Sequence, residues 1–430
     1  MPLLGTRGAA SARGFGFTAL TGIGGPYWIG ALTIASGAQG QGITVDSSGN
    51  VYIVGYAPPA GNPRFVISKY NNSGVIQWQR YFGSGTGYDT GYGIAVDSSG
   101  NVYVAGSTDS DISIAKYDNN GTIQWQRKLG GAYTDEAYGI AVDSSGNVYI
   151  TGYTSNPSEA VIAKYNTSGA IQWQRFFGGS GSQYGYGVAV DSSGNVYITG
   201  NSADNNNVII VKYDTNGTIQ WQRSLDSASG DYGRGISLDS SGNIYIVGST
   251  NSVQDVLIAK YNNSGTLQWQ RVLGDFASFN DIGRGIAVDS SGNVYITGYT
   301  TNGYKIIIAK YNTSGTIQWQ RTMDGVNTEY GYGISVDSSG NVYITGATNS
   351  IGSGNQPNII IAKLPSDGSK TGTYTVGGAS ITYAASSFTD AAGTLTSSTS
   401  TYTSATATLT DSASTLTSST STLTSSVTTI

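Results

Sequence analysis

Carboxylates are the side chains in this sequence best suited to acid–base chemistry. The chain has 430 residues, 26 of them Asp or Glu, and it has neither His nor Cys. Ser-His-Asp triads, thiolate nucleophiles, disulfides and most zinc or iron sites are therefore excluded. A pair of carboxylates could still hydrolyse a glycosidic bond. Six acidic residues lie in segments that vary along the chain, and these are the candidates: Asp89, Asp135, Glu136, Asp231, Asp281 and Glu329.

These six carboxylates show no recognisable catalytic motif. They are spread over different parts of the chain, and ordinary solvation of loop residues accounts for them. We therefore expect no enzyme activity, no cofactor and no metal site, and polysaccharide hydrolysis is the least favoured interpretation. Nucleic-acid binding is not expected either, because the net charge is −5 and a nucleic-acid groove needs clustered basic residues.

A second set of seven positions could bind a ligand. Tyr and Arg dominate the set, and both are good anchors for glycans or proteins. Each member lies near the start of a predicted strand. We expect the set to surround the mouth of a central channel. The alternative is sequence drift at unconstrained positions, which would give the same pattern. The seven residues are Gln41, Tyr92, Tyr138, Tyr186, Arg234, Arg284 and Tyr332.

An internal repeat determines the elements that position these residues, and repeats of this length decide a fold. The sequence Asp-Ser-Ser-Gly-Asn occurs seven times, 46 to 51 residues apart, at Asp46, Asp97, Asp143, Asp191, Asp239, Asp289 and Asp337. A tryptophan, usually within the sequence Gln-Trp-Gln-Arg, also recurs at a similar spacing. The tryptophans are Trp28, Trp78, Trp125, Trp173, Trp221, Trp269 and Trp319, and we expect them to pack the blades together.

One repeat predicts four short strands: Gly93–Val96, Val102–Gly106, Ile112–Tyr117 and Ile123–Arg127. The first two are joined by the Asp97–Asn101 segment. We interpret it as a tight turn and not a calcium loop, because no bidentate Glu follows it. Four antiparallel strands in a unit of this length indicate one blade of a β-propeller. Lys and Arg recur at fixed positions of the last two strands, which favours a structural role for them.

The number of blades follows from the two ends of the repeat region. The last repeat ends near Ile359–Lys363 and lacks a tryptophan strand, whereas Trp28 lies 18 residues before Asp46, in the frame of the other tryptophans. We therefore expect an all-β, seven-bladed β-propeller over residues 26–364, closed by its own N-terminal strand. Closure of this kind removes a free sheet edge.

The blade motif resembles the bacterial and phage β-propeller repeats called SBBP repeats. The resemblance rests on the Val-Asp-Ser-Ser-Gly-Asn-Val-Tyr-Ile-Thr-Gly stretch and on Ile-Ala-Lys-Tyr-Asn followed by Gly-Thr-Ile-Gln-Trp-Gln-Arg. It extends over roughly residues 26 to 364. The resemblance implies the propeller fold but leaves the function open, because propellers host many functions.

The N-terminal residues 1–25 form a Gly/Ala-rich arm that contains Arg7 and Arg13 and no acidic residue. The arm resembles the N-terminus of marine-phage structural proteins, such as those of cyanophage-like and pelagiphage-like viruses. Two interpretations remain open. The arm is a disordered leader, or it becomes ordered when it docks onto a partner.

The C-terminal part is expected to be a linker, 365–385, and a Ser/Thr-rich tail, 386–430. Large side chains recur every seven residues in the tail, at Phe388, Leu395, Tyr402, Leu409, Leu416, Leu423 and Ile430. On a helix these residues form one stripe, whereas an odd period would alternate faces on a strand. The pattern predicts an α-helical coiled-coil stalk and a homo-oligomer, with a trimer as our expectation. A disordered tail and a β-fibrous stalk are the alternatives. Similar tails occur in marine-phage fibre-like proteins.

These observations predict a non-enzymatic structural or recognition protein. The leading hypothesis is a virion fibre, appendage or head-decoration component of a phage, with other virion proteins and a host-surface glycan or protein as partners. The alternative is a bacterial extracellular or cell-surface propeller that binds glycan or protein. The sequence contains no run of 18 apolar residues, so we expect no membrane span. The first residues do not resemble a secretory signal.

Overall fold

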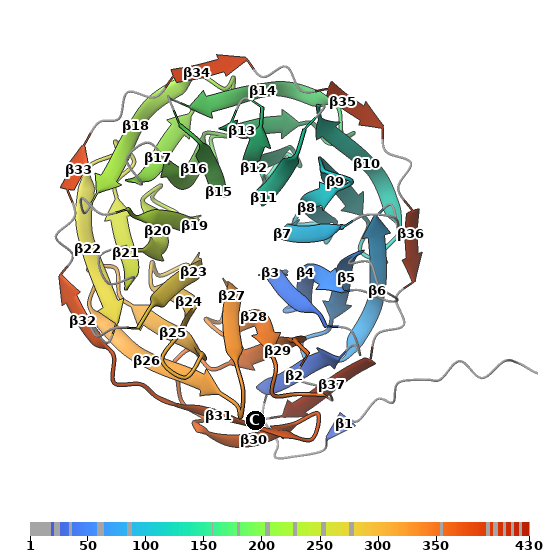
Figure 1. Cartoon of the computed structure of the whole chain (residues 1–430), viewed down its shortest axis with the longest axis vertical. Helices are drawn as coiled ribbons and strands as arrows, with labels where there is room; N and C mark the ends of the chain where they lie inside the picture. Colours follow the sequence, from blue (N-terminus) through green and yellow to red (C-terminus); the bar gives the residue numbers. More distant parts are fainter. Residues whose placement is uncertain are drawn as a thin grey trace, which may run out of the picture.

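The computed structural model describes residues 19–20, 26–33, 37–57, 64–83, 88–131, 133–156, 158–178, 181–202, 207–226, 230–250, 255–274, 279–352, 356–392, 396–398, 403–406, 410–413, 417–420 and 424–429. All regular secondary structure in these segments is β-strand. Seven sheets radiate from a central opening (Figure 1). The predicted all-β, seven-bladed propeller is therefore confirmed. The described residues offer no helix that could cross a membrane.

Each blade contains four antiparallel strands that follow one another from the channel to the rim. In the second blade these are β7 (Thr90–Val96), β8 (Val102–Thr108), β9 (Asp111–Tyr117) and β10 (Ile123–Gly130). The innermost strands of the other blades are β3 (Gln39–Val45), β11 (Asp135–Val142), β15 (Gln183–Val190), β19 (Tyr232–Leu238), β23 (Asp281–Val288) and β27 (Glu329–Val336).

The remaining strands of the other six blades have similar lengths. The second strands are β4 (Val51–Ala57), β12 (Val148–Ser155), β16 (Val196–Ser202), β20 (Ile244–Ser249), β24 (Val294–Thr300) and β28 (Val342–Thr348). The third strands are β5 (Arg64–Tyr70), β13 (Ser158–Tyr165), β17 (Asn207–Tyr213), β21 (Val256–Tyr261), β25 (Lys305–Tyr311) and β29 (Asn358–Leu364). The fourth strands are β6 (Ile76–Gly83), β14 (Ile171–Gly178), β18 (Ile219–Asp226), β22 (Leu267–Gly274), β26 (Ile317–Asp324) and, in the seventh blade, β2 (Trp28–Thr33).

The Asp-Ser-Ser-Gly-Asn segments are hairpin turns, as predicted. One oxygen of Asp97 accepts hydrogen bonds from the backbone N–H groups of Ser99 and Asn101, each at 2.9 Å. The other accepts from the Asn101 amide at 2.8 Å and from the Tyr103 hydroxyl at 2.9 Å. Burial alone would raise the pKa of Asp97, but these hydrogen bonds outweigh it and hold the pKa below its ordinary value. Protein donors thus satisfy both oxygens of the carboxylate.

Each blade is joined to the next by the repeated Trp, Arg and Lys side chains. The Trp78 indole N–H donates to the carbonyl oxygen of Asn119 in the second blade at 3.0 Å, and Arg80 Nε donates to that of Gly121 at 2.8 Å. Lys69 donates to the Asn119 side chain and lies over the Tyr52 ring. The Trp and Arg contacts recur from blade to blade. These side chains therefore have a structural role, because they connect neighbouring blades.

The seventh blade is closed by both ends of the repeat region, which confirms the predicted role of Trp28. Strand β2 pairs with β29 in antiparallel register, with Trp28 opposite Lys363 and Leu32 opposite Ile359. The Trp28 side chain is only 2% exposed, and its indole N–H donates to the Asn72 carbonyl oxygen in the first blade at 3.1 Å. This contact continues the blade-to-blade pattern across the closure.

Strands of the C-terminal part surround the outside of the propeller, and we call them the rim strands (Figure 1). One comes from residues 365–385, and the others come from the tail with its seven-residue repeat. The first, β31 (Ala379–Ala385), pairs with β26. The others add an antiparallel strand to β22, β18, β14, β10, β6 and β2 in turn. They are β32 (Thr389–Ala392), β33 (Thr396–Ser398), β34 (Thr403–Thr406), β35 (Thr410–Ala413), β36 (Thr417–Thr420) and β37 (Thr424–Thr429).

The predicted helical stalk is not confirmed, because the described segments of the tail are strands. An odd period alternates faces only if the strand is continuous. In the structure every strand ends within the heptad and the next one starts on another blade in the same register. Ala385 pairs with Arg321, Ala392 with Arg271 and Thr406 with Arg175. Thr, which is frequent here, also favours strands.

Most of the predicted tail stripe lies outside the described residues. Phe388 is half-buried and packs against the core between the fifth and sixth blades. The stripe residues outside the described segments are Leu395, Tyr402, Leu409, Leu416, Leu423 and Ile430.

The two segments next to the propeller also differ from simple connections. The expected linker 365–385 contains a hairpin of β30 (Gly372–Val376) and β31. Within the N-terminal arm the structure describes only β1 (Ala19–Leu20), which pairs in parallel with β37. The rest of residues 1–25 lies outside the described segments.

Candidate ligand site in the central channel

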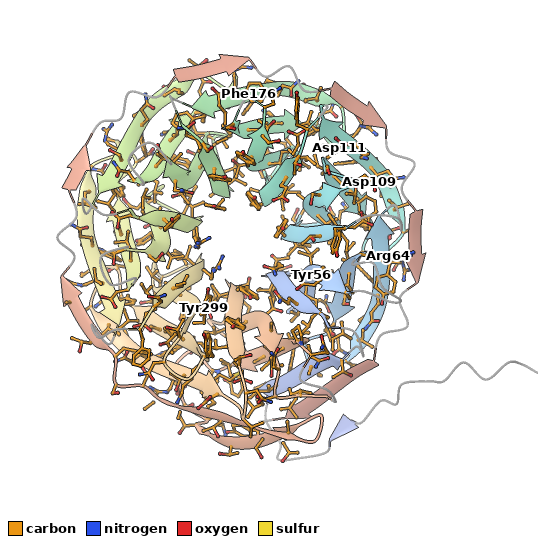
Figure 2. The ribbon with its side chains drawn as sticks, viewed as in Figure 1. Tyr56, Arg64, Asp109, Asp111, Phe176 and Tyr299 are labelled. Atoms are coloured by element: carbon orange, nitrogen blue, oxygen red, sulfur yellow. The ribbon has the colours of Figure 1, made fainter. Side chains whose placement is uncertain are left out.

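The seven residues predicted to surround the channel mouth line one cavity of about 180 Å³. Each comes from the innermost strand of a different blade, and each is half-buried. Figure 2 shows side chains with blue nitrogen atoms that reach into the central opening near β19 and β23. The residues that line the cavity are Gln41, Tyr92, Tyr138, Tyr186, Arg234, Arg284 and Tyr332.

A β-bulge points each of these side chains into the channel. Between Gly91 and Gly93 the pairing of β7 with β8 shifts by one residue, so Tyr92 has no register partner. The same shift occurs at the corresponding place in the other six blades. A bulge leaves its extra residue unpaired and re-aims its side chain. A Cβ atom on Gly93 would lie 3.0 Å from the backbone nitrogen of Ile140, so the following glycine lets neighbouring innermost strands approach closely.

Tyrosines form one side of the cavity. The ring centres of Tyr92 and Tyr138 lie 5.2 Å apart, and those of Tyr138 and Tyr186 lie 5.1 Å apart. Burial raises the pKa of Tyr92 to about 12 and raises the pKa of Tyr138 and Tyr186 as well. These hydroxyls are therefore neutral at physiological pH. The Tyr138 hydroxyl donates to Glu136 Oε2 at 2.6 Å.

Two arginines form the other side of the cavity. The Arg234 guanidinium lies 5.3 Å from the ring centres of Tyr186 and Tyr232. The Arg284 guanidinium lies 5.7 Å from those of Tyr299 and Tyr332. Burial, together with the charge of Arg284, lowers the pKa of Arg234 to about 10, so this side chain still carries its charge at neutral pH. The cavity thus combines aromatic surface with two neighbouring positive charges.

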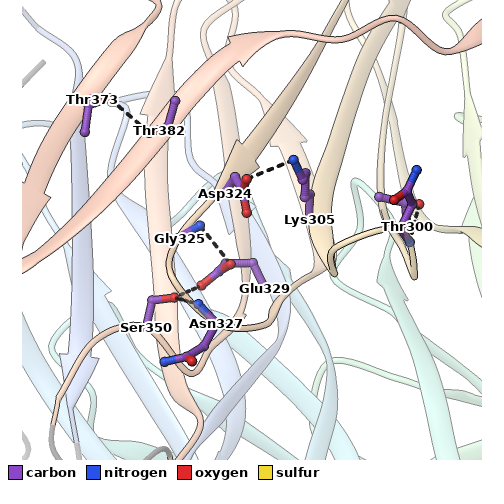
Figure 3. Close-up of polar contacts among 10 residues, drawn as sticks. Thr300, Lys305, Asp324, Gly325, Asn327, Glu329, Ser350, Thr373 and Thr382 are labelled. Atoms are coloured by element: carbon purple, nitrogen blue, oxygen red, sulfur yellow. Dashed lines mark hydrogen bonds and ion pairs between the residues drawn. The ribbon is translucent and has the colours of Figure 1, made fainter.

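None of the six candidate catalytic carboxylates is among the residues that line this cavity. Five of them are buried at the starts of the innermost strands of five different blades. Glu329 accepts from the Gly325 N–H at 2.9 Å and from the Ser350 hydroxyl (Figure 3). It also accepts from the Thr348 hydroxyl at 3.1 Å. Asp135 accepts from the Gly131 N–H at 2.9 Å.

The expectation that loop solvation explains these residues is therefore wrong for Asp89, Asp135, Asp231, Asp281 and Glu329. Burial raises the pKa of Asp135 and of Glu329, and for these two the contacts support a role in holding the connection between blades. Glu136, the sixth candidate, is the half-buried partner of Tyr138. In the described segments, no three Asp or Glu side chains are grouped closely enough to hold a metal ion.

A second layer of tyrosines lies behind the cavity residues, and it was not predicted from the sequence. The rings of Tyr153 and Tyr184 stack with centres 4.3 Å apart, and Tyr299 lies 4.8 Å from Tyr330. Tyr184 and Tyr330 each come two residues before a cavity residue, and side chains two apart on a strand share a face. That spacing is the sequence signal that could have identified the layer.

The SBBP model, described as a β-propeller repeat, matches residues 27–57, 77–113, 124–157, 172–206, 226–253, 268–305 and 325–352. These segments make up more than half of the chain. The chain belongs to the SBBP β-propeller repeat family. Five of the seven SBBP matches start just before the tryptophan of one blade and run into the next blade, so these matches include the tryptophan that makes the blade-to-blade contact. A second model, a DUF5122 β-propeller domain of unknown function, matches residues 240–267.

This SBBP protein has no match among curated proteins. Solved structures with a similar chain path include Sqt1 from Chaetomium thermophilum, at 11% identity over 83% of this chain and 97% of that chain, with a TM-score of 0.48. The β-propeller domain of the Trilobed protease from Pyrococcus furiosus shares 11% identity over 77% and 94%, with a TM-score of 0.47. The gluconolactonase XC5397 from Xanthomonas campestris shares 11% over 78% and 95%, with a TM-score of 0.41. Similarities this distant transfer no function.

Proposed function

We propose that this protein is a non-enzymatic recognition protein that binds its ligand at the mouth of the central channel. The observation that carries the proposal is the pattern of the innermost strands. In all seven of them a glycine follows the bulged residue, as Gly93 follows Tyr92, and an Ile or Val comes next. The side chain that enters the cavity changes type between Gln, Tyr and Arg. The residue two positions before it varies as well, as in Glu136, Tyr184 and Ile282, whereas the glycine after the bulged residue is constant. Side chains that vary at a cavity on a repeated scaffold are typical of binding sites.

The location of the exposed apolar side chains also supports the channel-mouth face as the binding face. The described residues include six exposed large hydrophobics. Five of them lie in the connections at the channel-mouth face, and only Val75 lies in a turn on the opposite face. Apolar residues gathered on one face mark interaction surfaces more often than scattered ones do. The five are Tyr88, Tyr133, Phe279, Tyr304 and Val326.

A surface-binding assay tests this proposal. The fluorescently labelled protein is incubated with intact bacterial cells from candidate hosts, and bound protein is measured by flow cytometry. We expect Tyr138→Ala combined with Tyr186→Ala to lose most of the binding, whereas Val75→Ala, at an exposed turn on the opposite face, keeps it. Binding that survives the double change but is lost with Val75→Ala would place recognition outside the channel.

We propose a phage particle as the place where this protein acts, as a fibre, appendage or head-decoration component. The support is the resemblance of the N-terminal arm to marine-phage structural proteins. The heptad tail adds no support, because its described segments are rim strands and not a stalk. Mass spectrometry of purified particles tests the location. Absence from the particles, together with secretion genes as neighbours, would favour the alternative, a bacterial extracellular binding propeller.

A further inference from the structure

Two positive charges in the cavity have no negative partner in the part of the chain that the structure describes. The three ion pairs within the described segments involve only Lys128 and Lys305. The Nε atoms of Arg234 and Arg284 are buried without a hydrogen-bond partner among the described residues. Arg284 makes one long hydrogen bond, from its terminal nitrogen to the Tyr299 hydroxyl at 3.4 Å. Most of the donor capacity of the two guanidinium groups is therefore available.

The propeller fold does not require arginine at these positions. The same bulge carries Tyr in four blades and Gln in one. A buried cation without a partner is unfavourable, and a second cation beside it adds repulsion. Two such residues in adjacent blades therefore indicate a ligand that compensates their charge.

We propose that the cavity binds an acidic sugar, with its carboxylate, phosphate or sulfate oxygens between Arg234 and Arg284 and its ring against Tyr92, Tyr138 and Tyr186. This proposal rests on the proposed function and names its ligand class. The guanidinium fork donates parallel hydrogen bonds that match the oxygens of such groups. The tyrosines supply apolar surface with neutral hydroxyls at its edge.

Size and charge both fit a single sugar ring. The cavity of about 180 Å³ is small compared with ligand pockets of about 300–1,000 Å³, which favours a small ligand such as one sugar ring. Glu136 is held at the tyrosine side through Tyr138, so the negative end of a ligand is favoured at the arginine side. The same carboxylate disfavours a second negative group on the ring.

Ligand-observed NMR and calorimetry with the full chain test the proposal. The probes are methyl β-D-glucuronide, glucose 6-phosphate and glucose 6-sulfate, with methyl β-D-glucoside as the neutral match and the peptide Gly-Glu-Gly as a non-sugar acid. We expect at least one acidic sugar to bind roughly tenfold or more tightly than the glucoside, because hydrogen bonds to charged groups are strong. The three acidic sugars distinguish a carboxylate from the other oxyanions. Added salt should weaken this binding.

Arg234→Gln combined with Arg284→Gln should abolish the preference for the acidic sugar. The matched control is Arg64→Gln, which removes the same charge from a loop-end position on the same face but outside the cavity (Figure 2). Arg234→Lys with Arg284→Lys keeps both charges and should retain part of the preference. A melting temperature for each variant shows that it is folded.

Three outcomes overturn the acidic-sugar proposal. If the glucoside binds as tightly as the acidic sugars, the charge selection is wrong, although the channel remains a binding site. If only Gly-Glu-Gly binds, the sugar assignment is wrong. If no probe binds while the Tyr138 and Tyr186 variant still loses binding to cells, the ligand class is wrong and the proposed function stands. If that variant also keeps its binding to cells, the proposed function fails too.

Discussion

The innermost and the rim strands of the blades both repeat seven times, but they repeat in different ways. The innermost strands come from separate repeats about fifty residues long, and each presents one bulged side chain that differs between blades, such as Tyr138 and Arg234. The rim strands come from one continuous segment, and each heptad contributes one strand to one blade.

The difference shows where structure and recognition lie in each blade. The rim strands use backbone pairing, which depends little on side-chain identity, and they cover an edge that would otherwise be open to other strands. The inner bulges point one side chain from each blade into the channel, so this side chain can change with little effect on the packing within the blade. We therefore expect large stability effects at the rim and at the closure, and small ones at the cavity.

Removal of the rim strands should give the largest effect. A chain ending at Phe388 lacks six strands, β32 to β37, and should lose on the order of 6 kcal/mol of unfolding free energy, at about 1 kcal/mol for one net hydrogen bond in each strand. It should also associate through its open edges. Urea unfolding and sedimentation measure both. A peptide of residues 389–430 added in trans should restore the loss. The rim assignment would be contradicted if truncation left the unfolding free energy and the association state unchanged. It would also be contradicted if the full chain were a trimer with a helical circular dichroism spectrum.

Breaking the closure should give the next largest effect. Trp28→Ala removes a side chain that is only 2% exposed and should cost about 3–5 kcal/mol, as for other buried aromatic residues. Trp125 occupies the same position in the second blade but is only partly buried, so Trp125→Ala is the matched control and should cost less. Chemical denaturation compares the two variants. Equal losses would mean that the seventh blade is no more dependent on its tryptophan than the others.

The turns on the face opposite the channel mouth should make stability depend on pH. The folded pKa of Asp46, Asp97, Asp143, Asp191 and Asp239 lies below the ordinary value of 3.8 because hydrogen bonds outweigh burial. A lowered folded pKa contributes stability above the unfolded pKa, and this stability is lost as the pH falls through the folded pKa. Unfolding free energy should therefore decrease from about pH 4 downward. Asp97→Asn should make the decrease shallower, and a variant that keeps the full slope would show that this turn does not contribute.

The cavity arginines should give the smallest effect on stability, with the opposite sign. Arg234→Gln combined with Arg284→Gln removes two neighbouring buried cations, so the unfolding free energy should stay the same or rise by up to about 1 kcal/mol. Thermal unfolding at low and high salt measures this, and salt should stabilise the native chain more than the variant. A loss of several kcal/mol would show that the arginines are structural.

The sequence predicted the propeller, its closure and the cavity residues because each depends on a position in a repeat. Trp28 could be assigned from its distance to Asp46, and the seven cavity residues from their place at the start of the first predicted strand of each repeat. Two features were missed because they depend on the tertiary structure. The heptads of the tail fit a helix and a series of six separate strands equally well, and only the propeller beside them selects strands. Asp135 and Glu329 start strands at loop ends, and the sequence does not show that neighbouring strands bury them.

The most direct test compares two pairs of substitutions in the third and fourth blades. Tyr138→Ala with Tyr186→Ala changes the cavity, and Trp173→Ala with Trp221→Ala changes the blade-to-blade contacts. The measurements are the unfolding free energy and the binding of each folded variant to host cells. We predict that the tyrosine variant loses binding and no more than about 1 kcal/mol of stability, whereas the tryptophan variant loses several kcal/mol and keeps its binding. The reverse result would contradict the division between structural contacts in the outer part of each blade and recognition in the channel.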